Sequence, residues 1–212
     1  MYWAKTPAWF RKIYPRDLVW DMPAEDEPSV YITFDDGPHP VATPFAMEQL
    51  NKYGAKATFF CVGNNVSKYP DIYAQLLANG HAVGNHTFDH VSGWKLSGDG
   101  YLRNITKAKA YINSDLFRPP YGRIKYSQVR KLKQAYPGWK IVMWDILSCD
   151  FDKTMSPQQC VDNVLNNIRP GSIVIFHDSE KAWDRMNYAL PPVLDYCRKK
   201  NWKMKALPQN HS

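Results

Sequence analysis

Short apolar runs that alternate with longer amphipathic segments restrict the fold of this chain more than any other feature. The apolar runs have the length and the β-branched and aromatic content of strands, and the segments between them repeat apolar residues at helical spacing. The expected strands are residues 30–34, 57–62, 81–85, 116–119, 140–146, 172–176 and 203–207. The expected helices are residues 43–53, 70–79, 99–114, 125–135, 156–168 and 187–200. Strands separated by helices in this order predict a parallel α/β fold.

The chain is expected to form one domain. Its 212 residues fit one domain of generous size, 44% of them are hydrophobic, and no Ser/Gly linker, charge run or repeat interrupts the pattern. Residues 1–28 precede the first strand and are aromatic and basic. We expect this extension to pack over one end of the domain formed by residues 29–212, with contact to a membrane interface as the alternative.

The charge of the chain permits a polyanionic partner without requiring one. The net charge is +7 and the isoelectric point is near 9.1. The basic residues are scattered, and their two clusters, residues 130–133 and 198–200, lie in expected helices. No nucleic-acid motif accompanies them, so solvated helix faces are the favoured interpretation and no nucleic-acid partner is expected. No obligate protein partner is evident either.

The cysteines and the apolar runs indicate in which cellular compartment the protein is expected. The four cysteines show no CxxC pairing, and Cys61 ends an apolar run, so buried thiols are expected instead of a disulfide framework. No run of 18 apolar residues predicts a transmembrane helix. The first twenty residues lack the uninterrupted apolar core of a signal peptide. The sequence therefore predicts a cytoplasmic protein unless a leader was removed.

Two adjacent aspartates, Asp35 and Asp36, follow the first expected strand in the stretch TFDDGP. Asp, Gly and Pro are ordinary turn residues, so this stretch alone favours a turn. In parallel α/β folds, however, reactive residues lie where strands end and loops begin. Adjacent strand residues point to opposite sides, so the two carboxylates need not share one role.

A histidine pair, His86 and His90, follows the third expected strand in the stretch NHTFDH. Four residues apart on a helical turn, two imidazoles lie on one face and can converge on one ion. Such a pair alone is more often hydrogen-bonded structure. Two neutral imidazoles with one carboxylate are a common catalytic zinc set that leaves a position open for water. Combined with an aspartate pair at a neighbouring strand end, the histidines favour a metal site.

Further reactive residues follow the later strands. Arg118 lies in the stretch FRPPYGR among residues that look buried, where an arginine usually has a carboxylate partner. The two prolines after it leave Tyr121 to offer the next backbone N–H. Asp150 follows the fifth expected strand, and His177 directly follows the sixth. A capping or core histidine is the alternative interpretation of His177.

Together these residues predict the machinery of amide or ester hydrolysis. A metal bound by Asp36, His86 and His90 lowers the pKa of its water to about 7 or somewhat above. Asp35 can accept the proton of that water, and His177 can donate a proton to the leaving group from the far side. A backbone N–H and the metal can hold the developing oxyanion.

The ordered motifs resemble a known family. The stretches TFDDGP, NHTFDH, RPPYG, WDILSCDF and IVIFH resemble the five motifs of the NodB-homology polysaccharide deacetylases, or carbohydrate esterase family four, over roughly residues 29–207. The resemblance implies a single-domain α/β fold, a distorted (β/α)7 barrel. It also implies a divalent metal, which is usually zinc, although cobalt or another transition metal is possible. It also implies removal of acetyl groups from N-acetylated glycans such as chitin or peptidoglycan, or from acetylated xylan.

The resemblance further implies a role for each matching residue. Asp35 is the general base, Asp36, His86 and His90 are the metal ligands, and Arg118 holds Asp35. The Tyr121 N–H helps to bind the oxyanion, and His177 is the general acid, tuned by Asp150. The residues implied to contact the substrate are Pro120, Tyr121, Trp144, Phe151 and Ile175, of which Trp144 and Ile175 line the pocket for the acetyl methyl group.

Three positions depart from the family pattern. In the fourth motif, Asp150 is followed by Phe151 where the family often has Trp, and Leu147 stands where it often has Asp; in the fifth, Ile175 replaces the usual Leu. These changes leave the metal and proton-transfer groups in place and put the shape of the substrate groove in doubt.

N-deacetylation of an amino sugar is the favoured activity, and O-acetyl esterase activity on the same site is the alternative. A non-catalytic glycan-binding protein is a further alternative, disfavoured because every ligand and the base are present.

Overall fold

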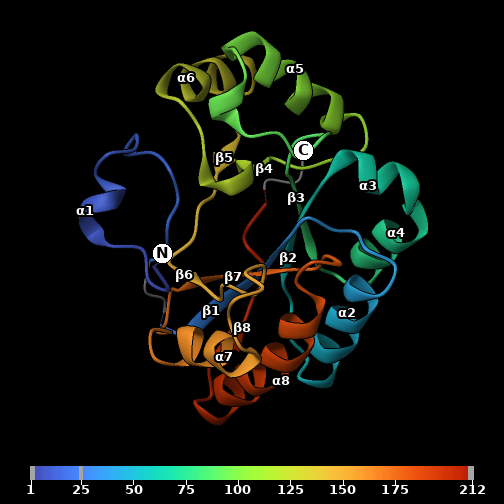
Figure 1. Ribbon diagram of the computed structural model, residues 1–212, viewed down its shortest axis with the longest axis vertical. Coiled ribbons are helices and arrows are strands. Elements are labelled where there is room, and N and C mark those ends of the chain that lie inside the picture. Colours follow the sequence, from blue (N-terminus) through green and yellow to red (C-terminus); the bar gives the residue numbers. More distant parts are fainter. Residues whose placement is uncertain (1–2, 24–25, 210–212) are drawn as a thin grey trace.

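A curled parallel sheet forms the centre of the protein (Figure 1). The computed structural model describes residues 3–23 and 26–209. The strands are β1 (Ser29–Asp35), β2 (Thr58–Cys61), β3 (Ala82–Asn85), β4 (Leu116–Phe117), β5 (Lys140–Ile141), β6 (Ile146–Leu147), β7 (Ile173–His177) and β8 (Lys203–Met204). The order across the sheet is β5-β4-β3-β2-β1-β7-β6, and β8 pairs with β1. The ladders between these strands are parallel, as the alternation of strands and helices predicts.

Helices surround the sheet on its outer side (Figure 1). They are α1 (Ala8–Arg11), α2 (Ala42–Lys52), α3 (Gly63–Lys68), α4 (Pro70–Ala78), α5 (Gly98–Lys109), α6 (Tyr126–Ala135), α7 (Pro157–Leu165) and α8 (Trp183–Lys199), with short 3-10 turns η1 (Gly93–Lys95) and η2 (Pro120–Gly122). The six expected helices are all present with shifted ends. The short α1 and α3 were not predicted, because four and six residues are too few to show a helical period.

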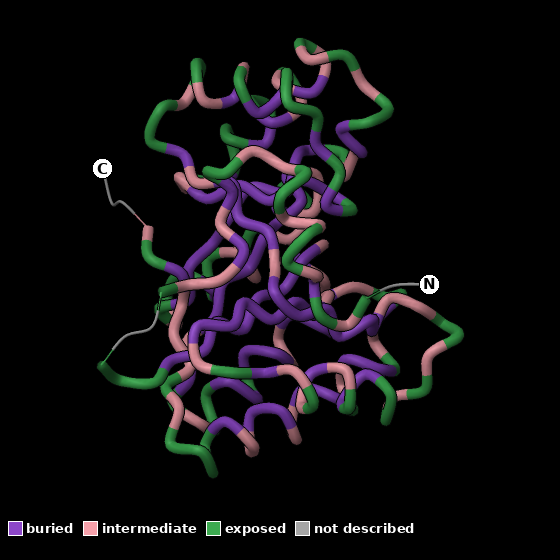
Figure 2. The backbone as a smooth tube through the Cα atoms, turned by 90° about the vertical axis from the view of Figure 1, so that its left-hand side faces the viewer, coloured by how far each residue is buried: buried purple, intermediate pink, exposed green. Residues whose placement is uncertain are grey.

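Strand β1 lies at the centre of the core because all seven of its residues are buried. A parallel strand covered on both faces needs apolar side chains on both, and the stretch SVYITFD supplies them up to its last residue. Figure 2 shows buried backbone through the middle of the molecule and exposed backbone on the outer turns. The four cysteines are buried free thiols, in agreement with the sequence.

The expected strand over residues 140–146 is wrong as a single element. The structure has β5 and β6 at opposite ends of the strand order, with the chain between them crossing from one edge of the sheet to the other. The Val142 N–H donates to Phe117 of β4, whereas the Asp145 N–H donates to Ile173 of β7. Because the two ends of this apolar run pair with opposite edges, the run cannot remain one regular strand. The result is a half-barrel, a distorted form of the predicted barrel.

The N-terminal segment lies against this crossing. Val19 pairs with Val142, donating to the Ile141 carbonyl and accepting from the Met143 N–H, and the Thr6 N–H donates to the Asp145 carbonyl. Leu18 and Trp20 are buried. The division into an extension of residues 1–28 and a domain of residues 29–212 stays a prediction.

The expected strand over residues 203–207 shortens to two residues. Strand β8 pairs with Ser29 and Val30 at the start of β1, far from the end that carries Asp35. In the part of the chain that the structure describes, no helix is long and apolar enough to cross a membrane.

Candidate active site

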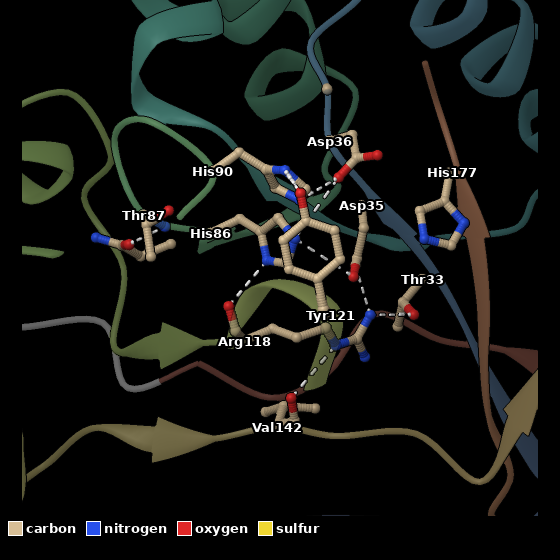
Figure 3. Close-up of polar contacts among 12 residues, drawn as sticks. Thr33, Asp35, Asp36, His86, Thr87, His90, Arg118, Tyr121, Val142 and His177 are labelled. Carbon is tan, nitrogen blue, oxygen red and sulfur yellow. Dashed lines mark hydrogen bonds and ion pairs between the residues drawn. The ribbon is translucent and has the colours of Figure 1, made fainter. Parts of the chain in front are cut away.

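The sequence-predicted residues meet at the carboxyl ends of the parallel strands. Asp35 is the last residue of β1 and pairs in register with His177, the last residue of β7. His86 directly follows β3, and Arg118 directly follows β4. Figure 3 shows Asp35 and Asp36 between the imidazoles of His86 and His90 on one side and the imidazole of His177 on the other.

A buried ion pair fixes Asp35. The Nη1 of Arg118 donates to Asp35 Oδ1 at 2.7 Å and to Thr33 Oγ1 at 2.8 Å, and neither charged side chain is more than 4% exposed. The guanidinium also donates to the carbonyls of Val142 and Met143. Burial lowers the pKa of Arg118, and the Asp35 carboxylate acts against that effect. The carboxylate partner that the sequence predicts for Arg118 is therefore Asp35.

Asp36, His86 and His90 form a compact cluster whose ligand atoms lie within 4.8 Å of one another. The Oδ1 of Asp36 is 3.0 Å from His90 Nε2 and 3.7 Å from His86 Nε2. Burial opposes the charge of Asp36, but the contact with His90 and the charges of nearby histidines hold the pKa of its carboxyl below the usual range. Burial also lowers the pKa of His86 to about 4, so this imidazole is neutral near pH 7.

The hydrogen bonds of His86 define which ring nitrogen faces the cluster. Its Nδ1 lies 2.8 Å from the Arg118 carbonyl, which can only accept, so Nδ1 carries the hydrogen. Nε2 then presents a lone pair toward Asp36, as a metal-binding imidazole with a backbone partner does.

The donor set fits a divalent cation. Asp36 Oδ1 is buried. It lies close to His90 Nε2, but that contact does not have the geometry of a hydrogen bond, and no other described residue donates to this oxygen. An unsatisfied buried carboxylate oxygen is costly unless a partner such as a metal ion binds it. Two imidazole nitrogens and one carboxylate oxygen match the three-ligand sets of catalytic zinc sites.

Strained backbone accompanies the cluster. Two members of the cluster have left-handed φ angles, Asp36 at 81° and His90 at 52°, and so does Thr87, between the two histidines, at 65°. Such conformations are uncommon, above all for a β-branched residue, and they concentrate at functional sites. The helical turn expected between His86 and His90 is wrong, because these residues form an irregular loop. The two imidazoles still converge, with ring centroids 5.1 Å apart, through these turns of the backbone.

His177 is held by Asp150. One carboxylate oxygen of Asp150 accepts the His177 backbone N–H at 2.7 Å, and the other lies 2.7 Å from Nδ1. Burial alone would lower the pKa of His177, but the charge and the hydrogen bond of Asp150 outweigh it and raise the pKa to about 9. The imidazole is therefore protonated near pH 7.

The residues predicted to contact a substrate have different surroundings, and Tyr121 contacts the metal-ligand cluster directly. Tyr121 is exposed, has a φ of 61°, and its hydroxyl lies 3.2 Å from His90 Nδ1. Ile175 is buried and packs with Trp144 and Phe151 in one apolar cluster. The Phe151 ring also meets the His177 ring at a centroid distance of 5.1 Å. Pro120 is buried in η2, directly before Tyr121.

Sequence reasoning missed Asp178, which holds the loop after β1. Its carboxylate accepts the Gly37 N–H at 3.0 Å and the Thr43 hydroxyl at 2.5 Å. Burial raises the pKa of Asp178 well above its usual range. Its place directly after His177 at a strand end was a usable signal. Asn65 also holds this loop by donating to the Asp36 carbonyl at 2.7 Å, and nothing in the sequence marks it.

The fold and the residues at the carboxyl ends of its strands define a class of α/β half-barrel proteins with an Asp/His/His cluster beside a second, arginine-paired aspartate. Residues 23–136 match the family model described as polysaccharide deacetylase. The chain belongs to this family of hydrolases, as the resemblance of its motifs implies.

Two curated relatives illustrate the family. The chain is 35% identical to a peptidoglycan-N-acetylglucosamine deacetylase of Bacillus cereus over 71% of its own length and 56% of the relative's. It is also 35% identical to a chitooligosaccharide deacetylase of Azorhizobium caulinodans over 73% of its length and 75% of the relative's.

A solved structure agrees with the fold. The crystal structure of the Bc1960 peptidoglycan N-acetylglucosamine deacetylase, in complex with 4-naphthalen-1-yl-N-oxidanyl-benzamide, superposes with a TM-score of 0.85 at 30% identity. The match covers 96% of this chain and 95% of that one. The likeness extends over nearly the whole length of both chains and confirms the predicted barrel class.

Proposed function

We propose that this protein removes the acetyl group from an N-acetylated amino sugar in a glycan such as a chito-oligosaccharide or peptidoglycan. The observation that carries the proposal is the convergence of Asp36, His86 and His90 beside a separate carboxylate, Asp35, with His177 on the other side. Membership of the polysaccharide deacetylase family supports it.

Asp36, His86 and His90 would hold the metal, and the donor set favours Zn²⁺, with Co²⁺ or another transition metal as a substitute. When bound, such a cation polarises an acetyl carbonyl and makes water a better nucleophile at neutral pH. The neutral His86 and the ionised Asp36 are already in the protonation states that metal binding requires.

Asp35 acts as the general base. Arg118 holds the base in place through the hydrogen bond from Nη1 to Asp35 Oδ1, and the same Nη1 also donates to Thr33 Oγ1. One oxygen of Asp35 is engaged by Arg118, and the other, Oδ2, lies 3.7 Å from His86 Nε2 and faces the cluster. This orientation leaves Oδ2 available to accept a proton from the attacking water.

His177 acts as the general acid. Asp150 binds the Nδ1 side of the ring, so Nε2 carries the proton that can be transferred to the leaving nitrogen when the carbon–nitrogen bond breaks. The backbone N–H of Tyr121 would help to stabilise the negative charge that develops on the carbonyl oxygen. The methyl group of the acetyl would lie against Trp144 and Ile175, which pack in one apolar cluster with Phe151. Pro120, directly before Tyr121 in η2, would be a further substrate contact.

Acetate release tests the proposal. Purified protein loaded with Zn²⁺ or Co²⁺ should release acetate from chito-oligosaccharides or peptidoglycan fragments, a chelator should abolish the release, and added metal should restore it. Acetylated xylan tests the alternative of O-acetyl esterase activity, because an ester and an amide pass through the same kind of tetrahedral intermediate. Metal-loaded protein that releases no acetate from any of these substrates would refute the proposed function.

A further inference from the structure

An aromatic cavity next to the candidate active site shares Tyr121 and Trp144 with the proposed substrate contacts, and its other lining residues have no role in the proposed chemistry. Its volume is about 230 Å³, and Tyr121 and Trp144 form the side that adjoins the site. The N-terminal segment contributes Trp3, Phe10 and Tyr14 to the lining. Tyr121 links the two regions, because it lines the cavity and its hydroxyl contacts His90 of the cluster.

The walls from the N-terminal segment are fixed in place before any ligand binds. The Tyr14 hydroxyl donates to the Gly122 carbonyl at 3.1 Å, and the Thr6 hydroxyl donates to the Trp144 carbonyl at 3.0 Å. Phe10 packs edge-on against Trp3 at a centroid distance of 5.5 Å. Arg11 anchors the segment through ion pairs with Asp21 and the buried Asp145. Rings held in this way lose little freedom when a ligand packs on them.

Two tryptophans that line the cavity have exposed side chains. Trp3 is 48% exposed and Trp94, in the short turn η1, is 55% exposed. An exposed indole face is an apolar surface of the size and shape on which the C–H face of a sugar ring packs. Two such faces next to the site favour a further sugar residue of the same glycan chain as the occupant.

The cavity also carries an uncompensated positive charge. The Arg123 guanidinium lines it and lies over the Trp94 ring, 5.0 Å from the centroid. Within residues 3–23 and 26–209, no carboxylate forms an ion pair with Arg123. An exposed guanidinium that faces no acid presents free donors suited to a ligand carboxylate.

We propose that this cavity binds a carboxylate-bearing sugar adjacent to the sugar that is deacetylated, with Trp94 and Trp3 stacking on the ring and Arg123 pairing with the carboxylate. The proposal rests on the proposed function and narrows its substrate class. Of the two glycans considered above, only peptidoglycan has such a sugar, because the lactyl group of each muramic acid that bears no stem peptide ends in a free carboxylate, whereas chitin is uncharged. The structure thus favours peptidoglycan strands over chito-oligosaccharides.

The test compares two tetrasaccharides in acetate release: a peptide-free peptidoglycan strand and chitotetraose. The parent protein should have the higher kcat/KM for the peptidoglycan strand. Arg123→Gln should reduce the ratio of the two kcat/KM values about ten- to hundredfold, the usual worth of one hydrogen bond to a charged group. Converting the lactyl carboxylates of the strand to methyl amides should lower the ratio similarly for the parent and have little further effect on the variant.

A matched control removes a different surface arginine. Arg130→Gln makes the same change in net charge on an exposed position of α6 and should leave the ratio unchanged. Trp94→Ala should raise KM for both tetrasaccharides, because it removes a stacking face and leaves the carboxylate partner in place. If Arg123→Gln releases acetate with the same ratio of the two kcat/KM values as the parent, the cavity proposal is overturned and the proposed function still stands. No acetate release from either tetrasaccharide by the parent would instead refute the proposed function.

Discussion

Asp150 binds His177 through both of its carboxylate oxygens, one at the backbone N–H and one at Nδ1, each at 2.7 Å. Asp150 lies in the turn after β6, and His177 ends β7, 27 positions later in the sequence. This double contact orients the ring and also determines its charge, because burial alone would lower the pKa that Asp150 raises to about 9.

The first prediction concerns the pH dependence of activity. A general acid works in its protonated form, so activity should persist as pH rises until it passes the raised pKa of His177 near 9. Asp150→Asn removes the negative charge and should move the alkaline limb of the kcat/KM profile to lower pH by about one to two units, the equivalent of a charged hydrogen bond.

Asp152 provides the control for this change. It lies two residues away, is partly exposed, and accepts hydrogen bonds from Thr154. Asp152→Asn should leave the alkaline limb in place. An unchanged limb in Asp150→Asn would show that another group sets it.

The second prediction separates the two adjacent aspartates. Asp35→Asn should keep the metal and reduce kcat by about a hundredfold or more, because only proton acceptance is lost and the amide oxygen can still accept from Arg118. Asp36→Ala should lose both metal and activity, because it removes a ligand group from the cluster. Elemental analysis of each purified variant gives the metal content. Release of the metal by Asp35→Asn would contradict the assigned division of roles.

Much of the site follows from the sequence because strand ends gather on one edge of a parallel sheet. Asp35 and His177 are 142 positions apart by number, yet each ends an apolar run, and the structure places them in register on β1 and β7. The pattern of strands was enough to predict this meeting. The sequence also predicted that a carboxylate would pair with Arg118, because a buried arginine needs an acidic partner.

The remaining features depend on backbone geometry that no residue pattern encodes. His86 and His90 converge through a loop with left-handed Thr87 and His90 and not through a helix, and threonine is among the residues least expected there. The break between β5 and β6 is similar. It arises because one apolar run pairs with β4 at one end and with β7 at the other, and such long-range pairing leaves no mark on local periodicity.

The third prediction concerns the buried pair of Arg118 and Asp35. Arg118→Met leaves the Asp35 carboxylate buried without its partner, which should lower the free energy of unfolding by about 3–5 kcal/mol. The double variant Arg118→Met/Asp35→Asn removes both charges and should be more stable than Arg118→Met alone. Chemical denaturation measures both. Equal stability of the single and double variants would show that the unpaired charge is not the cause.

The fourth prediction concerns Gly37, which follows the two aspartates. A Cβ atom at this position would lie 2.0 Å from Asp178 Oδ2, so Gly37→Ala must displace the carboxylate that holds the loop. Overpacking of this kind should cost about 1–3 kcal/mol of stability, and the shift of the neighbouring Asp36 should lower the metal content. Gly138→Ala is the control, because nothing lies within 4 Å of its added Cβ.

A double variant tests whether the clash with Asp178 is the cause. If it is, adding Gly37→Ala to Asp178→Ala should lower stability little more than Asp178→Ala alone, because the clashing carboxylate is already absent. Additive losses in the double variant would place the effect of Gly37→Ala elsewhere in the loop.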